Sequence, residues 1–311
     1  MLSVLEVKRR LPDEFVENLY ELYSPGTVDK ILSGMSGERS TTIRVNTLKT
    51  TMLELMKNIK EEAIKFNRVL WYENALEIIN ANEKQLQKLL NYENGEFYLQ
   101  SLSSMVPPLV LEPEENEKIL DLTAAPGSKT TQMSMMMQNK GYILANELDK
   151  IRCERLKYNV KMQGAKIVEV KNGRGEKIGE QYPEFFDKVL LDAPCSGEGR
   201  FLANQVGTYR NWSIKTVKQC AKIQKKLIKS AYQALKTNGI MVYSTCTLNK
   251  EENEEILQWA IENMNLQMLD ISIKIPNTLK AFGDKNIEKA IRMLPSKSQE
   301  GFFVAKLRKR G

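Results

Sequence analysis

Two cysteines, Cys195 and Cys246, are the residues whose types and positions most clearly indicate chemistry in this chain. Cys195 lies in the sequence DAPCS and Cys246 in STCT, and each comes shortly after an apolar run that is typical of a buried strand. In an open parallel sheet, ligands and catalytic groups collect where the strands end. We therefore expect the two thiols to face one pocket, in which a thiolate attacks an electron-poor carbon.

A turn of small residues at 121–130 lies between a predicted strand and a predicted helix. Backbone amides in such a turn can approach a ligand closely at the N-terminus of a helix. The turn does not match GxGxxG and lacks the spacing of a P-loop, which argues against a dinucleotide or a nucleoside triphosphate. Glu147 follows Gly127 by about 20 residues, at the end of the next predicted strand, where such folds hydrogen-bond a ribose diol.

The composition limits the classes of protein and site that fit. The chain has 311 residues, 42% of them hydrophobic, and a net charge of +7, which is a mild bias toward polyanionic partners. The four cysteines form no CxxC pair and there is no histidine, so we expect no metal site. Without histidine, proton removal must rely on a cysteine, a carboxylate or water. No segment resembles a signal peptide or a membrane span, and we expect a soluble, cytoplasmic monomer with reduced thiols.

The elements that must position these groups divide the chain into two parts. In the first hundred residues, helical spacing over 12–35 and 52–62 is mixed with strand-like patterns over 42–47 and 68–72. Pro107, Pro108 and the acidic stretch that follows them mark the approach to a second part. We predict a smaller α+β domain over 1–105 and a second domain over 106–311.

From Lys118 onward, strand and helix patterns alternate, which indicates an α/β fold with a doubly wound, mostly parallel sheet. A late edge strand is expected over 301–307. The other predicted elements are strands at 119–122, 142–145, 167–170, 188–191 and 240–243, and helices ending at 138 and spanning 150–163 and about 213–236.

Several segments, in their order and spacing, resemble motifs of the NOL1/NOP2/Sun family of RNA cytosine-5 methyltransferases, in particular its bacterial ribosomal RNA methyltransferases. The similarity covers nearly the whole chain and implies a Rossmann-like class I methyltransferase domain behind an N-terminal RNA-positioning domain. The similar segments are 44–49, 98–104, 121–130, 191–199, 243–247, 251–254 and 301–305.

The resemblance implies a role for each of four side chains. Cys246 attacks carbon 6 of a cytosine, after which carbon 5 takes a methyl group from S-adenosylmethionine. Cys195 helps to remove the proton from carbon 5, and Asp192 lies against the ring nitrogen and the amino group, supported by Lys129. The residues alone do not rank the two cysteines, because DNA cytosine-5 methyltransferases place their nucleophile in a Pro-Cys motif, which would nominate Cys195.

The resemblance also implies a binding site for S-adenosylmethionine. Glu147 would contact the ribose, and Arg152 matches an arginine that the family carries shortly after that acid. Asn172 stands where the family usually has an aspartate near the adenine, and we expect its amide to take over as the polar contact to the adenine. Ser128 stands where the family's loop commonly has glycine. The other expected cofactor contacts are Ala124, Ala125, Pro126, Gly127, Lys129 and Asp192.

The expected substrate is a cytosine in RNA, removed from its stack because the reacting carbon lies in the ring. Ribosomal RNA of the small subunit is favoured, and transfer RNA is the alternative. A DNA methyltransferase fits less well because of the second cysteine in STCT. An RNA-binding ribosome-assembly protein without catalysis is disfavoured by the intact Cys195, Cys246, Asp192 and Lys129.

Overall fold

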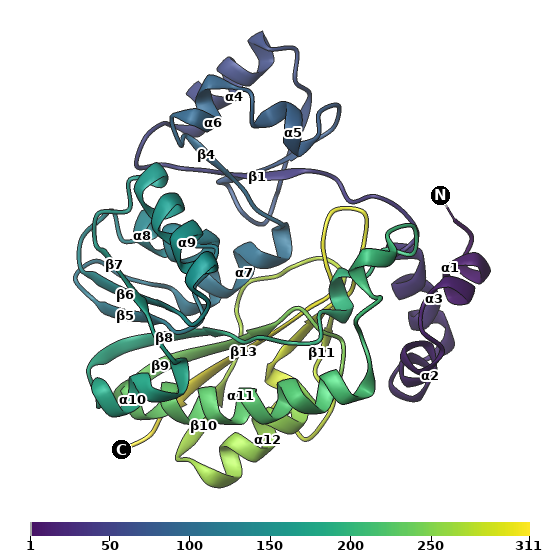
Figure 1. The fold of residues 1–311 in the computed structure, drawn as a ribbon, viewed down its shortest axis with the longest axis vertical. Helices are drawn as coiled ribbons and strands as arrows, with labels where there is room; N and C mark the ends of the chain where they lie inside the picture. Colours follow the sequence, from purple (N-terminus) through teal and green to yellow (C-terminus); the bar gives the residue numbers. More distant parts are fainter. Residues whose placement is uncertain (1) are drawn as a thin grey trace.

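A computed structural model describes residues 2–311, which form a large sheet, a small sheet and a group of N-terminal helices (Figure 1). The large sheet has nine strands in the order β11-β12-β13-β9-β8-β5-β6-β7, with β10 paired to β13. Its strands are β5 (Lys118–Asp121), β6 (Tyr142–Glu147), β7 (Val168–Asn172), β8 (Phe186–Asp192), β9 (Leu235–Thr245), β10 (Leu266–Leu269), β11 (Thr278–Lys280), β12 (Ile291–Met293) and β13 (Phe302–Lys309).

The strands β5 to β9 pair in parallel, as predicted. Successive residues point to opposite faces of the sheet, so each strand serves two cores. In β8, for example, Val189 and Leu191 lie in the core on one face and Leu190 in the core on the other. The chain order reverses between β5 and β8, and ligands bind at such a switch point in open α/β sheets.

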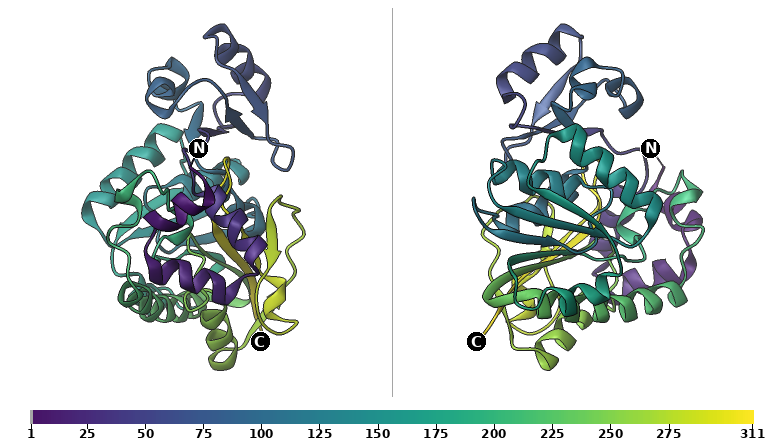
Figure 2. Two further views of the ribbon diagram at one scale, coloured as in Figure 1. Left: turned by 90° about the vertical axis from the view of Figure 1, so that its right-hand side faces the viewer. Right: turned by 60° about the vertical axis from the view of Figure 1, so that its left-hand side comes forward.

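Helices cover both faces of the parallel part (Figure 2). One face packs on α11 (Ile214–Ala234) and α12 (Glu254–Asn263), and the other on α7 (Leu102–Leu111) and α8 (Ser128–Met136). Helix α9 (Lys150–Gln163) has the predicted bounds, and the short α10 spans Ile178–Gln181. The single-turn helices are η1 (Gly175–Lys177), η2 (Glu198–Arg200), η3 (Val206–Thr208) and η4 (Ile287–Lys289).

The strand predicted over 301–307 exists, but the prediction that it is an edge strand was wrong. Strand β13 pairs antiparallel with β9 along one side and with β12 and β10 along the other. The short strands β10, β11 and β12 carried too little period-two signal to be predicted. They cover the edge that the sequence pattern alone leaves open.

The small sheet precedes α7 and has the antiparallel order β2-β3-β1-β4. Strand-like character was predicted at 68–72, but the strand ends at Arg68, and a turn leads into the next strand. The strands are β1 (Thr42–Val45), β2 (Phe66–Arg68), β3 (Ala75–Ile78) and β4 (Phe97–Leu99), with the helices α4 (Met52–Glu61), α5 (Glu83–Leu86) and α6 (Leu90–Glu93).

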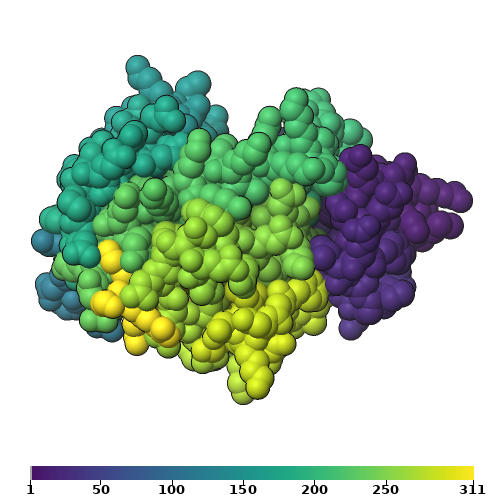
Figure 3. Space-filling view, turned by 90° about the horizontal axis from the view of Figure 1, so that it is seen from below, coloured from purple at the N-terminus to yellow at the C-terminus, as the bar shows by residue number. Residues whose placement is uncertain are grey.

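The first three helices pack on the second half of the chain rather than on the small sheet. They are α1 (Val4–Arg10), α2 (Asp13–Leu22) and α3 (Pro25–Gly34). Helices α2 and α3 replace the single helical stretch predicted over 12–35, and α1 was not predicted. Phe15 stacks edge-on against Phe201 at 4.9 Å and Trp212 at 5.8 Å. In the space-filling view, these helices lie directly against segments from near residue 200 and near residue 290 (Figure 3).

The domain boundary at residue 105 stays a prediction. Helix α7 runs continuously through that position, and Pro107 and Pro108, which we expected to mark the approach to the second domain, lie inside it. Proline lacks the N–H that would pair with a carbonyl one turn earlier. For Pro108 that carbonyl belongs to Ser104, and it accepts a hydrogen bond from Gln100 Nε2 at 3.1 Å instead.

Arg44 on β1 joins the small sheet to the start of α8. Its guanidinium is fully buried and donates to Gln100 Oε1 at 2.7 Å, to the Ser128 carbonyl at 2.6 Å and to Thr131 Oγ1 at 3.0 Å. Burial lowers the pKa of Arg44 to about 10, so it remains charged at neutral pH. A buried cation with three acceptors fixes the sheet relative to the helix.

Replacing Arg44 by alanine should therefore destabilise the fold. The substitution removes a charged donor from three acceptors, of which Gln100 Oε1 and Thr131 Oγ1 are buried, and we expect a loss of about 3 kcal/mol in the free energy of unfolding. Urea denaturation followed by circular dichroism measures this loss. Arg68→Ala, at an exposed position of the same sheet, is the matched control and should change stability by less than about 0.5 kcal/mol. Equal effects of the two variants would contradict the role of Arg44.

Candidate active site

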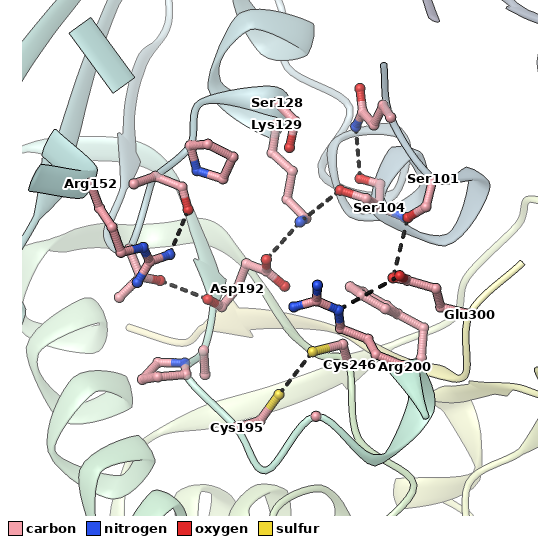
Figure 4. Close-up of a pocket in the computed structure, with 18 of the residues that line it drawn as sticks. Ser101, Ser104, Ser128, Lys129, Arg152, Asp192, Cys195, Arg200, Cys246 and Glu300 are labelled. Carbon is pink, nitrogen blue, oxygen red and sulfur yellow. Dashed lines mark hydrogen bonds and ion pairs between the residues drawn. The ribbon is translucent and has the colours of Figure 1, made fainter. Parts of the chain in front are cut away.

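A cavity of about 1100 Å³ opens at the carboxyl ends of the parallel strands β5, β6, β8 and β9. Figure 4 shows side chains from several distant segments converging on it. Eight of the residues predicted to do chemistry or to hold the cofactor line it: Ala125, Pro126, Lys129, Glu147, Arg152, Asp192, Cys195 and Cys246. Ala124, Gly127 and Asn172 are not among its lining residues.

The two cysteines lie beside each other at this cavity. Strands β8 and β9 pair in parallel with Asp192 opposite Ser244, so the loops that follow them leave the sheet side by side. The two sulfur atoms are 3.2 Å apart. The hydrogen bond with Cys246, followed by burial, raises the pKa of the Cys195 thiol well above its ordinary range. The structure thus brings the two thiols together at one cavity.

Asp192 and Lys129 form an ion pair beside the thiols. Lys129 Nζ lies 2.6 Å from Asp192 Oδ2 and also donates to Ser104 Oγ at 2.9 Å. Asp192 Oδ1 accepts a hydrogen bond from Ser244 Oγ at 2.8 Å. These contacts fix the carboxylate and the ammonium side by side, presenting an acceptor and a donor to the cavity.

The loop before α8 is held in a conformation that favours glycine. Gly127 has a φ of +105°, and a Cβ at this position would meet Leu156 Cδ1 at 2.9 Å. Arg152 donates to the Ala125 carbonyl at 2.8 Å, and Asn159 donates to the Pro126 carbonyl at 2.8 Å. The loop is therefore shaped by its own backbone and by α9 before any ligand binds.

Glu147 is 4% exposed at the end of β6. Its carboxylate accepts from the Asp149 backbone N–H at 2.9 Å and lies 3.6 Å from the Arg152 guanidinium. The side chain of Asn172 donates to the backbone carbonyls of Glu147 and Leu148, at 2.8 and 3.0 Å. The position of Asn172 thus supports the turn that carries Glu147.

Glu252 was not predicted as a site residue, although it is fully buried beneath the cysteine loops. It accepts from the Ser196 N–H at 3.0 Å, from Ser196 Oγ at 2.5 Å and from Gln224 Nε2 at 2.9 Å. Ser196 Oγ also lies 2.8 Å from Thr247 Oγ1, which links the two cysteine loops. The EENE stretch gave a family signal for this residue, but nothing in the sequence showed which partners it would have.

Glu198 is a second buried carboxyl between the same loops. Its Oε1 accepts from Trp212 Nε1 and from Asn249 Nδ2, both at 3.1 Å. Burial and, to a lesser degree, the nearby negative charge of Glu252 raise the pKa of Glu198 to about 7. Burial similarly raises the pKa of Asp121 to about 7, beneath the loop that precedes α8.

Arg200 and Glu300 were also missed, and they lie at the side of the cavity away from Arg152 (Figure 4). The Arg200 Nε is 3.7 Å from Glu300 Oε1, and Ser101 Oγ donates to Glu300 Oε2 at 3.3 Å. These residues come from separate segments, so only the fold brings them together. No group of residues suited to hold a metal ion occurs within 2–311.

The sheet order, the loop before α8 and the acid ending β6 together define a class I methyltransferase fold. A methyltransferase homologue from Pyrococcus horikoshii is 32% identical, with 99% of each chain covered and a TM-score of 0.85. The NSun6 of the same organism, solved with SFG, is 26% identical and covers 97% of this chain and 99% of its own, also with a TM-score of 0.85.

The profile of the family described as 16S rRNA methyltransferase RsmB/F matches residues 108–308. The ribosomal RNA small subunit methyltransferase F of Vibrio atlanticus is 36% identical over 96% of this chain. The chain spans 64% of the length of that relative. The chain therefore belongs to the RsmB/F (NOL1/NOP2/Sun) family of S-adenosylmethionine-dependent RNA cytosine-5 methyltransferases, as the sequence motifs predicted. No helix in the described part of the chain is long and apolar enough to cross a membrane.

The raised pKa of Glu198 predicts a dependence of stability on pH. Between the ordinary pKa of 4.5 and the folded value of about 7, the folded state holds a proton that the unfolded state has lost. Stability therefore falls as pH rises through this window, by at most about 1.4 kcal/mol per pH unit, and levels off above it. Glu198→Gln should lack this contribution.

Urea denaturation of the wild type and Glu198→Gln from pH 4.5 to 8 measures the difference. Glu61→Gln, at an exposed position of α4, is the control, and its free energy of unfolding should change with pH in the same way as that of the wild type. A constant gap between wild type and Glu198→Gln across the window would show that Glu198 does not titrate there.

Proposed function

We propose that this protein methylates carbon 5 of a cytosine in RNA, with the small-subunit ribosomal RNA as its substrate. The observation that carries the proposal is the 3.2 Å contact of the Cys195 and Cys246 sulfurs beside the Lys129–Asp192 pair. The name of the relative in Vibrio atlanticus supports small-subunit ribosomal RNA as the substrate. Reaching a ring carbon requires that the base leave its stack and enter the cavity.

The cavity fits S-adenosylmethionine at its Arg152 side. The carboxylate of Glu147 is positioned for the ribose diol, and the exposed side chain of Leu148 offers an apolar surface to the adenine. The backbone of the loop through Ala125 and Pro126 bounds the site, and Asn172 supports it through the turn at Glu147. The bound cofactor supplies an electrophilic methyl group to the base.

The edge of cytosine offers an amino N–H donor and a ring-nitrogen acceptor side by side. The Asp192 carboxylate accepts from the amino group, and the Lys129 ammonium donates to the ring nitrogen. A donor on the ring nitrogen draws electrons from carbon 6 and makes it a better electrophile. Uracil presents the opposite pattern, so the same pair favours cytosine.

The 3.2 Å contact of the two sulfurs allows one thiol to act as the nucleophile and the other as the base. With Cys195 protonated and donating to Cys246, the Cys246 thiolate attacks carbon 6. The attack turns the Cys246 thiolate into a thioether. Its hydrogen bond with Cys195, which is the main cause of the raised pKa of Cys195, is then lost. Cys195 then loses its proton to solvent and, as a thiolate, removes the proton from the methylated carbon 5. Elimination of Cys246 releases the product.

Labelled S-adenosylmethionine tests the proposed substrate. Purified protein is incubated with small-subunit ribosomal RNA, large-subunit ribosomal RNA, transfer RNA and DNA, all without 5-methylcytosine. We expect label in the small-subunit ribosomal RNA, as 5-methylcytosine after digestion. Label confined to transfer RNA or DNA would overturn the substrate assignment, and no label in any of them would overturn the activity.

Two cysteine variants test the division of roles. Cys246→Ala should abolish turnover, by at least about 10³-fold, because no nucleophile reaches carbon 6. Cys195→Ala should still form the covalent adduct but fail to resolve it, giving a protein–RNA band that survives denaturing electrophoresis. Cys153→Ala, away from the cavity, is the control and should behave as wild type. An adduct with Cys246→Ala and none with Cys195→Ala would exchange the two roles.

Glu147→Gln tests the cofactor site. The amide keeps the shape of the side chain but loses the charge, so the hydrogen bonds to the ribose diol weaken. We expect the Kd for S-adenosylmethionine to rise about tenfold in titration calorimetry, which corresponds to about 1.4 kcal/mol. Glu61→Gln serves again as the control. An unchanged Kd in Glu147→Gln would contradict the proposed contact between Glu147 and the ribose.

A further inference from the structure

Arg200 lies at the cavity, and its side-chain N–H donors have almost no partners among residues 2–311. Its side chain is 65% exposed, and its closest ionic partner, Glu300, lies at 3.7 Å. Arginine carries five N–H donors, yet the Arg200 side chain makes no hydrogen bond to any of residues 2–311. A guanidinium with free donors beside a reaction centre is a ready partner for an anion.

The backbone of Arg200 is held in place. The Arg39 guanidinium donates to the carbonyls of Gly199, Arg200 and Phe201, at 3.0, 3.3 and 3.3 Å. The Arg200 N–H donates to the Gly197 carbonyl at 2.9 Å. The side chain therefore projects from a fixed point, which lowers the entropy lost when it binds a ligand.

Glu300 is positioned to compete for Arg200. Ser101 Oγ donates to its carboxylate, and Ser103 Oγ donates to its carbonyl at 2.8 Å. At 3.7 Å the carboxylate is near enough to attract Arg200 but too far to form a hydrogen bond. It occupies the position that an incoming anion would take.

The reaction determines which anion arrives there. The cofactor takes the Arg152 side of the cavity, and the base lies against Asp192 and the two thiols. The ribose and its phosphates must then leave on the other side, where Figure 4 shows Arg200 and Glu300. We infer that Arg200 binds a backbone phosphate next to the target cytosine, and that Glu300 holds this site in the free protein. This inference rests on the proposed action on RNA.

Two opposite substitutions test the site. Arg200→Ala should weaken binding of a 12-nucleotide single-stranded RNA with one central cytosine by about tenfold. The slope of log affinity against log salt should fall by about 0.7 because one phosphate contact is lost. Glu300→Gln removes the competing charge and should tighten binding about threefold. Fluorescence anisotropy across salt concentrations measures both affinity and slope.

Steady-state methylation separates phosphate binding from an effect on the thiols. With Arg200→Ala, KM for RNA should rise while kcat at saturating RNA changes by less than about twofold. Arg200→Lys keeps the positive charge but lacks the forked donor geometry of the guanidinium. Its KM for RNA should therefore lie between the values for Arg200→Ala and the wild type. Arg308→Ala is the control, since Arg308 is exposed on β13 about 20 Å along the strand from Phe302 at the cavity.

An unchanged RNA affinity and salt slope in Arg200→Ala would overturn the inference. So would a drop in kcat or a shifted pH profile with unchanged affinity, because either would place the action of Arg200 on the cysteines. The affinity for S-adenosylmethionine should match wild type in every variant, which confirms that the cavity is folded. The binding measurement needs no turnover, so it tests the phosphate contact even if the wild type methylates none of the RNAs, an outcome that would defeat only the proposed function.

Discussion

The parallel pairing of β8 with β9 is the constraint on which the rest of the site depends. It sets Asp192 opposite Ser244, and the two cysteine loops follow from that register. A shift of one residue would turn every side chain of the strand to the other face of the sheet. The cores on both faces oppose such a shift, because Val189, Leu190 and Leu191 are all fully buried. The geometry of the two thiols is thus determined by the packing of the sheet.

Beneath the thiols, the protein uses buried polar groups where apolar packing would hold the loops less specifically. Glu252 bridges the Cys195 loop to α11 through Gln224, and Glu198 connects the same loop to Trp212 and Asn249. Each buried carboxyl is costly to ionise, and burial raises the pKa of both. In return, each loop is fixed by directional hydrogen bonds, which define one arrangement of the sulfurs.

Much of the catalytic half was predictable because its signals are local. Buried parallel strands appear as apolar runs, and the motifs around Gly127, Cys195 and Cys246 stand directly at strand ends. The edge assignment of β13 failed because its partners β10 and β12 are only four and three residues long. The neighbours of Glu252, and the meeting of Arg200 with Glu300, depend on contacts between distant segments. No periodicity in one sequence encodes such contacts.

The packing of the first three helices determines how the chain can be divided. Their apolar faces cover Phe201, which follows directly after Arg200, and the buried Arg292 donates to Tyr23 Oη at 2.6 Å, joining the segment after α2 to β12. A fragment beginning at residue 106 would expose this surface and lose the Arg39 contacts that hold the loop after Cys195. The segment before the small sheet therefore belongs, in mechanical terms, to the catalytic half. A chimera that exchanges the small sheet and its helices should take its crossover points from the ends of that sheet and keep the first helices with the methyltransferase core.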